Sequence, residues 1–201
     1  GLLRGGDQVS TLLGQIGNTV LEGAGGDDTL TDLDGNNIFA GGTGDDAATG
    51  GAGNDLFIGG AGNDTLTTGA GNNVIAYNAG GGVDTVYADA GADNTLSLGG
   101  GLRYADLSLS RNDNDLVLNT GVDDQIIFKD WYVGRNKLLN LQMILDATDE
   151  FDANSADPLF NRRVQNFDFL GLVNGFDAAQ AANPGLTRWA LSDALMQYHL
   201  S

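Results

Sequence analysis

A nine-residue repeat occupies the first part of this sequence and limits the folds open to the chain. Aligned on one apolar position, residues 5–76 divide into the consecutive units GGDQVSTLL, GQIGNTVLE, GAGGDDTLT, DLDGNNIFA, GGTGDDAAT, GGAGNDLFI, GGAGNDTLT and TGAGNNVIA. The eighth position is apolar throughout, with Leu12, Leu21, Leu30, Phe39, Ala48, Phe57, Leu66 and Ile75. Neither a helix nor an ordinary strand has this period, whereas one apolar residue per short unit indicates a solenoid whose units share a core.

Each unit supplies three strand residues, of which the middle one points inward, and six residues that reverse the chain. Glycines permit the positive φ angles that such turns require. Two nine-residue units form one coil, and like strands of successive coils stack in parallel at about 4.8 Å. The core is one side chain thick, and Ala48 faces the layer that holds Phe39 and Phe57. The predicted fold class is an all-β solenoid, a parallel β-roll.

The acidic residues are nearly all aspartates. Of the 27 acidic residues only Glu22 and Glu150 are glutamates, and the formal net charge is −18. Aspartate is typical of turns and of tight oxygen-ligand sites. Such a charge argues against nucleic acid and anionic membranes as partners, and no apolar run approaches the roughly 20 residues of a membrane span. The sequence has no cysteine, which excludes disulfides and cysteine-based metal sites.

Successive turns of the solenoid lie on opposite edges, so sixth-position residues of alternate units share an edge. One edge, which we name the aspartate edge, carries Ser10, Asp28, Asp46 and Asp64. A two-residue insertion, Tyr77-Asn78, shifts the repeat so that Asp84 is the next residue on this edge. The opposite edge, named the asparagine edge, carries Thr19, Asn37, Asp55 and Asn73. A core this thin does not by itself offset a ladder of stacked carboxylates, so we expect a cation to neutralise the aspartate edge.

The units resemble the GGxGxDxUx repeat of RTX proteins, the haemolysin-type calcium-binding family. GGAGNDLFI and GGAGNDTLT match every fixed position, and the resemblance is strong over residues 23–67 and loose over 5–96. In that family each calcium ion lies between neighbouring turns of one edge. It is bound by the carbonyls of positions two and four and the aspartate of one turn, with the carbonyls of positions one and three and the aspartate of the next. Six hard oxygens including two carboxylates suit Ca²⁺ better than Mg²⁺.

The resemblance implies three calcium sites on the aspartate edge. The first would use Ala24, Gly26, Asp28, Gly41, Thr43 and Asp46. The second would use Gly42, Gly44, Asp46, Gly59, Ala61 and Asp64. The third spans the insertion and would use Gly60, Gly62, Asp64, Ala79, Gly81 and Asp84.

On the asparagine edge Asp55 stands between Asn37 and Asn73, so a calcium site there has one carboxylate rather than two. The alternative is that amide side chains hydrogen-bond along the edge and leave it free of metal. Both interpretations stay open. An EF-hand is not an alternative for these Asp- and Gly-rich runs, because Asp32-Leu-Asp34 is followed by glycine too early and no glutamate closes the loop.

From Asp93 the period fades, and longer, more conventional strands follow. We expect strands at 107–110, 115–119 and 125–132, and residues 140–145 fit either a strand or a short helix. This run resembles the haemolysin-type calcium-binding related domain, which implies a cap on the open end of the solenoid. Trp131 and Tyr132 are expected to be buried against the last coil. The predicted domains are the roll (1–98), a β-rich cap (99–150) and a linker with C-terminal helices (151–201).

The C-terminal segment shows a linker at 152–160, dense helical spacing from Val164 to Phe176, and an amphipathic pattern from Thr187 to Leu200 after a break at Pro184. The sequence predicts two helices here, packed on the cap or presented to a partner. The chain opens inside patterned sequence, so we expect a fragment that packs against upstream repeats or downstream residues. Its one histidine, His199, is expected at the surface of a helix end, and the sequence has no HExxH or GxSxG motif. We expect no catalytic activity.

The resemblance implies a calcium-triggered folding module from the C-terminal part of a large bacterial RTX protein (toxin, adhesin or exoenzyme) exported by a type I secretion system. Its location would be extracellular or at the cell surface. The rival hypotheses are a structural or adhesive solenoid that binds a surface or partner, and the non-catalytic tail of a secreted hydrolase. An ice-binding face needs regular threonines, and Thr29, Thr31, Thr49, Thr65 and Thr67 do not recur in every coil.

Overall fold

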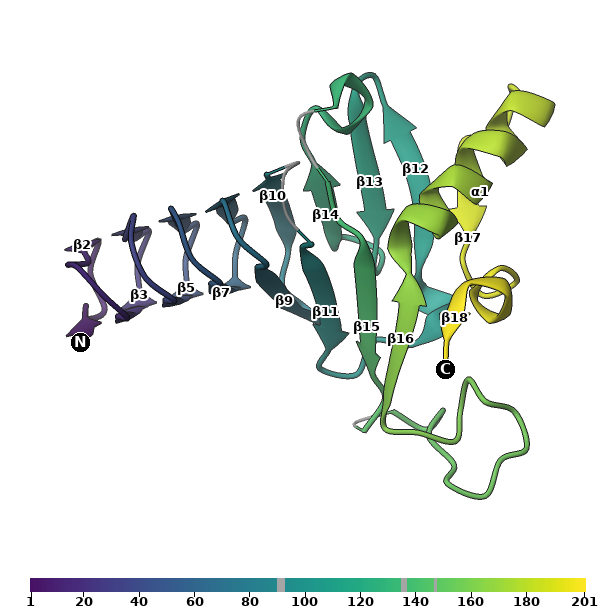
Figure 1. Ribbon diagram of the computed structural model, residues 1–201, viewed down its shortest axis with the longest axis horizontal. Coiled ribbons are helices and arrows are strands. Elements are labelled where there is room, and N and C mark those ends of the chain that lie inside the picture. The colour runs from purple at the N-terminus through teal and green to yellow at the C-terminus, as the bar shows by residue number, and fades with distance from the viewer. Residues whose placement is uncertain (90–92, 135–136, 147) are drawn as a thin grey trace.

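The computed structural model describes residues 1–89, 93–134, 137–146 and 148–201, and the strands of this part of the chain form two nine-stranded sheets (Figure 1). Sheet I has the order β1 (Leu2–Arg4), β3 (Val20–Gly25), β5 (Ile38–Thr43), β7 (Leu56–Ala61), β9 (Val74–Asn78), β11 (Thr95–Gly99), β15 (Asn140–Ile144), β16 (Val164–Asp168) and β18 (His199–Leu200). Sheet II has the order β17 (Trp189–Ala190), β12 (Ser108–Asn112), β13 (Asp115–Asn119), β14 (Gln125–Phe128), β10 (Val83–Ala88), β8 (Thr65–Gly69), β6 (Ala47–Thr49), β4 (Thr29–Thr31) and β2 (Thr11–Leu13).

The repeat region forms the predicted parallel β-roll. Its chain alternates between the two sheets, and each strand pairs in parallel with the strand one coil away. Eighth-position residues stack in register, with Leu21 against Phe39 in sheet I and Leu30 against Ala48 in sheet II. Figure 1 shows the coils as a narrow ladder that leads from the N-terminus to a broader C-terminal part. The all-β solenoid is therefore confirmed.

The core of the roll is one side chain thick. Phe39 and Phe57 stack with ring centroids 4.7 Å apart and an interplanar angle of 6°. Ala48 is buried in the opposite sheet, between the larger Leu30 and Leu66. The small residue leaves room for the two rings, since packing in a thin core conserves total volume.

Both sheets of the roll continue into the C-terminal part without interruption. Strand β14 pairs in parallel with β10, and β15 pairs in parallel with β11. Beyond them the pairing becomes antiparallel, as β13 and β12 extend sheet II and β16 and β18 extend sheet I. The backbone of the last coil is thus hydrogen-bonded rather than open, which is what a cap must achieve. The strand predicted at 115–119 is confirmed, and residues 140–144 are a strand rather than a helix.

The C-terminal segment is less helical than the sequence predicted. Helix α1 spans Phe169–Ala182, but Val164–Asp168, expected to be helical, forms β16. The amphipathic helix predicted from Thr187 to Leu200 is wrong. Those residues form β17, a 3-10 turn at Leu195–Tyr198 and β18. Each sheet has an edge that needs hydrogen-bond partners, and pairing with that edge overrode the local helical pattern.

Trp131 and Tyr132 are partly buried against the hydrophobic core, and both also contact α1. They lie in the 3-10 turn Trp131–Val133. The Trp131 ring packs edge-on against Phe169, at a centroid distance of 6.0 Å. The Tyr132 hydroxyl donates to Asp177 Oδ1 at 2.8 Å. The strand predicted for residues 125–132 therefore ends at Phe128, after which the chain turns toward α1.

His199 was expected at a helix end and lies instead in β18, where it is half-buried. Its Nε2 atom is 2.7 Å from Gln165 Oε1, and its ring packs on Phe167. These contacts assign His199 a place in the packing of sheet I. Among the described residues, no helix is long and apolar enough to span a bilayer.

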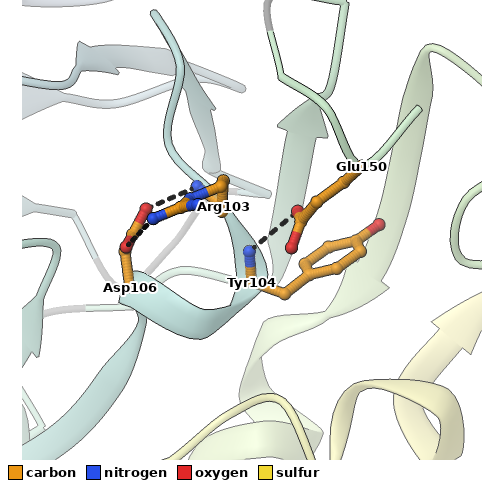
Figure 2. Close-up of polar contacts among 4 residues, drawn as sticks. All are labelled: Arg103, Tyr104, Asp106 and Glu150. Carbon is orange, nitrogen blue, oxygen red and sulfur yellow. Dashed lines mark hydrogen bonds and ion pairs between the residues drawn. The ribbon is translucent and has the colours of Figure 1, made fainter.

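The long connection before β16 is tied to the cap by polar contacts (Figure 2). The backbone N–H of Tyr104, at the start of the 3-10 turn Tyr104–Asp106, donates to Glu150 Oε2 at 3.1 Å. In the same turn the Arg103 N–H donates to Asp106 Oδ2 at 2.8 Å. The Tyr104 hydroxyl reaches the Leu159 carbonyl at 2.7 Å. Residues 152–160, predicted as a linker, contain no helix or strand but are anchored by this contact.

Candidate metal sites between the turns

The sixth-position aspartates form a hydrogen-bonded ladder along the aspartate edge. The Oδ1 atom of each accepts the backbone N–H of the sixth residue one coil earlier. The donor–acceptor distances are 2.6 Å from Ser10 to Asp28, 2.7 Å from Asp28 to Asp46, 2.8 Å from Asp46 to Asp64 and 3.0 Å from Asp64 to Asp84. Each carboxylate is therefore held between two turns, and Asp84 keeps its place across the insertion.

The second carboxylate oxygen of these residues is buried without a partner. Among the described atoms, Oδ2 of Asp28, Asp46 and Asp64 receives no hydrogen bond and is shielded from solvent. Burial of a carboxylate oxygen without a donor is costly. Three such atoms, one per coil, fit a row of bound cations.

Backbone carbonyls of positions two and four point toward the next coil. A Cβ on Gly44 would lie 2.5 Å from the Gly26 oxygen, and a Cβ on Gly42 would overlap the Ala24 oxygen. Gly62 shows the same relation to Gly44. These turns require glycine because only hydrogen fits beside the carbonyl of the coil before.

Carbonyls of positions one and three point the other way, toward the preceding coil. The Gly41 oxygen lies 2.5 Å from where a Cβ on Gly23 would be, and the Gly59 oxygen has the same distance from Gly41. The Ala61 carbonyl accepts the N–H of Gly44 at 2.9 Å. Forward and backward carbonyls of neighbouring turns thus converge between the turns, where Oδ2 also lies.

First-position glycines form the inner wall of this space. A Cβ on Gly23 would overlap Asp28 Oδ2, and a Cβ on Gly41 would overlap Asp46 Oδ2. The same holds for Gly59 and its own Asp64. Any larger residue would occupy the region in which the carboxylate and the first carbonyl of the next turn meet.

The residues predicted for the first two sites lie in neighbouring turns and in register. Ala24 pairs with Gly42 and Gly42 with Gly60, while Thr43 pairs with Ala61. Four of the six residues predicted for the third site, Gly60, Ala79, Gly81 and Asp84, border a hollow of about 210 Å³ beside the insertion. The other two, Gly62 and Asp64, do not line this hollow.

Backbone oxygens outnumber side chains in these spaces. The described residues contain no group of three or more His, Cys, Asp or Glu side chains arranged to hold a metal. A cation between the turns would instead be bound by carbonyls and by one or two carboxylates. Such hard oxygen donors on a flexible frame suit calcium.

The asparagine edge repeats the ladder with one atom changed. Asn37 Oδ1 accepts the N–H of Thr19 at 2.8 Å, as an aspartate would. Its Nδ2 donates to the position-four carbonyl of its own turn, Gly35, at 3.1 Å. Asn73 Nδ2 donates likewise to Gly71 at 3.0 Å. The amide therefore gives these carbonyls a donor where an aspartate would present a second acceptor.

Asp55 is the exception on this edge. Its Oδ1 accepts the Asn37 N–H at 2.7 Å, while its Oδ2 is buried and, among described atoms, unpartnered. The carbonyls of Gly51 and Gly53 point toward the next coil, as on the aspartate edge. The inter-turn space that follows Asp55 thus resembles those of the aspartate edge, because it contains an unpartnered carboxylate oxygen and forward-pointing carbonyls, but it has one carboxylate.

Comparison with protein families identifies these units. The model of the RTX calcium-binding nonapeptide repeat (4 copies) matches residues 13–48, 41–75 and 78–95. Residues 13–95 are RTX calcium-binding repeats. Comparison with curated proteins gave no match to the chain. The match of 78–95 places the unit after the insertion within the RTX series, whereas the resemblance of the following segment to a related domain stays a prediction.

The RTX ladder ends at a tyrosine from the insertion. The Tyr77 hydroxyl donates to the Gly82 carbonyl at 2.7 Å, which is the position-four carbonyl of the turn that ends in Asp84. Burial raises the pKa of Tyr77 to about 12, so the hydroxyl keeps its proton. The Tyr77 hydroxyl thus gives the last turn of the aspartate edge a hydrogen-bond donor for its position-four carbonyl.

Burial dominates the electrostatics of the RTX carboxylates. It raises the pKa of Asp64 to about 6 and that of Asp84 to about 7, against the partial compensation of one backbone N–H each. The neighbouring carboxylate in the ladder adds a smaller upward contribution to both pKa values. Burial also raises the pKa of Asp46 and of Asp55. A bound cation would reverse these shifts, because it favours the charged form.

Sequence reasoning missed how sixth-position donors complete a turn. Ser10 Oγ donates to the Gln8 carbonyl at 2.9 Å, and Thr19 Oγ1 donates to the Gly17 carbonyl at 3.3 Å. Both are position-four carbonyls, like those that the asparagine amides reach. The sequence contains a signal for this difference, because the side chain at the sixth position is either aspartate, which only accepts hydrogen bonds, or Ser, Thr or Asn, which can also donate one. The role of Asp32 at position one was also missed.

Proposed function

We propose that this chain is a calcium-triggered folding module from the C-terminal part of a large bacterial protein exported by a type I secretion system. The RTX repeats and the β-roll support calcium binding. The export route and the extracellular or cell-surface location rest on the resemblance to RTX proteins. We assign the chain no catalytic role.

The observation that carries this proposal is the row of buried, unpartnered Oδ2 atoms at Asp28, Asp46 and Asp64. At Asp28 and Asp46 this oxygen lies near a backbone carbonyl of the next turn, so the inter-turn space brings together acceptors that a bound cation would satisfy. The thin core does not offset this cost, whereas a bound ion supplies its binding free energy to the fold.

We assign three ions to the aspartate edge. The first lies between Asp28 and Asp46, the second between Asp46 and Asp64, and the third between Asp64 and Asp84, each with the carbonyls predicted from the repeat. Asp46 serves two ions, because its Oδ1 faces the preceding turn and its Oδ2 lies beside Gly41 at the following space. We assign a further ion to the inter-turn space after Asp55, where Asp55 would be its one carboxylate ligand.

Calcium then acts as the signal for folding. In a calcium-poor cytosol the charged repeats stay expanded and fit for passage through a secretion channel. Outside the cell, calcium in the range that extracellular modules bind, roughly 10⁻⁴–10⁻³ M, folds the roll onto the cap. We infer that the cap (99–150) supplies the edges on which the roll (1–98) stacks, and that residues 151–201 complete both sheets.

The test is circular dichroism of the full chain dialysed free of calcium and then titrated with it. We expect β-sheet signal to rise cooperatively with calcium and not with magnesium at equal concentration. An equal β-sheet signal with and without calcium would contradict the proposal.

The adhesive alternative has weaker support. Threonines 31, 49 and 67 do stack in register on the outward face of sheet II. The parallel row is interrupted, since Ala47 stands between Thr29 and Thr65. This face is therefore not a regular threonine array, and we do not assign it a surface-binding role.

A further inference from the structure

Asp32 is a buried carboxylate that the repeat pattern does not explain. It stands at position one of its unit, where most units have glycine. The residue is 3% exposed, and its Oδ2 has no hydrogen-bond partner in the described part of the chain. Within the described residues, its Oδ1 accepts only the N–H of Asp34, at 3.3 Å. A side chain that breaks the glycine rule and buries an unpaired oxygen requires a compensating contact.

The Asp32 side chain enters the inter-turn space of the coil before it. A Cβ on Gly14, the first-position glycine one coil earlier, would overlap the Asp32 carboxyl group. At Gly23 and Gly41 the same region holds Oδ2 of the sixth-position aspartate of the same turn. The turn that begins at Gly14 has Thr19 at position six and lacks that carboxylate. Asp32 thus brings a carboxylate, from the neighbouring coil, to the position that Thr19 leaves without one.

Asp32 borders a hollow in the surface of the roll. Together with Gln15, Ile16, Leu33 and Asp34 it borders an open hollow of about 360 Å³ between the turns 14–19 and 32–37. None of the described residues that border this hollow is basic. Asp34 is exposed at the hollow and adds a second carboxylate.

We propose that Asp32 creates an additional divalent-cation site on the asparagine edge, between the turns 14–19 and 32–37, that takes calcium. The inference rests on the proposed calcium binding by the roll and extends it to a carboxylate outside the repeat's sixth position. Asp32 Oδ2 and carbonyls of the turn 14–19 bind the ion from the protein side, and water completes its shell from the open side. One buried carboxylate and an open hollow make this site weaker than those of the aspartate edge.

The experiment counts calcium ions bound per full-length chain at saturation by equilibrium dialysis. Two variants test the site. Asp32→Asn removes the charge at constant shape, and Asp32→Gly restores the glycine that the other turns tolerate, so folding is preserved in at least one of them. Asp123→Asn is the matched control, because Asp123 is an exposed aspartate outside the repeats. Terbium in crystals of the wild-type chain then locates the ions by anomalous scattering.

We expect both Asp32 variants to bind one ion fewer than the wild type and the control, and a terbium peak beside Asp32 that disappears in Asp32→Gly. Asp32 variants that bind the wild-type number of ions would overturn this inference alone. A wild-type chain that binds no calcium would overturn the proposed function as well. The two failures are thereby distinguishable.

Discussion

Asp46 on the aspartate edge and Asn37 on the asparagine edge occupy the same position of their units and differ in one side-chain atom. On both edges Oδ1 accepts the N–H of the coil before, at 2.7 Å for Asp46 and 2.8 Å for Asn37. The other terminal atom is an unpartnered oxygen in Asp46 and an amide nitrogen bonded to Gly35 in Asn37. The exchange of an oxygen for an NH₂ group therefore decides whether the sixth side chain can donate a hydrogen bond to a carbonyl of its own turn.

We infer from this difference that a turn of the roll depends on metal when its sixth side chain lacks a hydrogen-bond donor. The carbonyls of positions two and four point into the inter-turn space on both edges. Where the sixth residue has a donor, as in Ser10, Thr19, Asn37 and Asn73, it reaches carbonyls of its own turn. Where the sixth residue is aspartate, acceptors face acceptors and a cation must take the place of the donor.

Calcium removal should have the largest effect, and it should act through the aspartate edge. A site with calcium at 100 times its dissociation constant contributes about 2.7 kcal/mol, so three independent sites contribute roughly 8 kcal/mol, comparable with the whole stability of a domain. We expect the roll to unfold in chelator. Limited proteolysis with mass spectrometry should then show cleavage in residues 1–98 before the cap, which has conventional antiparallel pairs. Simultaneous digestion of both would contradict this prediction.

Acid should partly replace calcium in the metal-free chain. Burial raises the folded-state pKa of Asp64 to about 6 and of Asp84 to about 7, above the usual 3.8. A raised folded pKa means stability that is present at low pH and lost as pH rises through the folded value. For Asp64 the loss is at most on the order of 3 kcal/mol. Urea unfolding in calcium-free buffer should show a more stable roll at pH 5 than at pH 7.5, and saturating calcium should diminish this difference.

Aspartates on the two edges should respond differently to loss of charge. Asp46→Asn removes a carboxylate from two neighbouring inter-turn spaces, so we expect the first and second ions to fail together. Asp55→Asn removes at most the single ion on its side, because the flanking Asn37 and Asn73 carry donors already. Calorimetric calcium titration of both variants measures the ion number. Equal losses in the two variants would show that both edges bind metal alike.

The reverse exchange should transfer aspartate-edge behaviour to the asparagine edge. Asn73→Asp replaces the nitrogen that donates to Gly71 at 3.0 Å with an acceptor. We expect the variant to lose about 1–3 kcal/mol of stability at low calcium, the usual cost of an unsatisfied buried group, and to recover it at high calcium. Thermal unfolding at two calcium concentrations tests this, with Asn72→Asp on the exposed neighbouring position as the control. Equal calcium sensitivity of the two variants would contradict the donor rule.

The smallest expected effect is at the end of the ladder. Tyr77→Phe removes the hydroxyl that donates to Gly82 while keeping the ring beside Gly81. We expect a loss of about 1 kcal/mol in chemical unfolding with calcium present and an unchanged ion number. A gain of one ion in this variant would mean that the tyrosine excludes a site rather than closing the ladder.

The sequence by itself determined the repeat region in detail. Period nine established the coil, the buried eighth positions and the stacking of Asp28, Asp46 and Asp64 on one edge. Asp84 was placed correctly across the insertion, because each coil must return to the same register to pair its strands. In such a fold every contact is made with the next repeat, so the linear pattern contains the spatial arrangement. The predicted carbonyl ligands followed from the family resemblance, and their binding of calcium stays a prediction.

Tertiary structure decided the rest. Residues 164–168 and 189–200 have helical spacing, yet they pair with strands that are distant in sequence, because the outer edges of both sheets offer hydrogen bonds that a local pattern does not show. The donor role of the sixth-position amides became visible only with the carbonyl directions known. Sequence patterns assign Asp32 no role beyond a run that fails as an EF-hand, and only the structure places its carboxylate beside Gly14. Its surroundings depend on two coils at once, and one unit of the repeat contains only half of them.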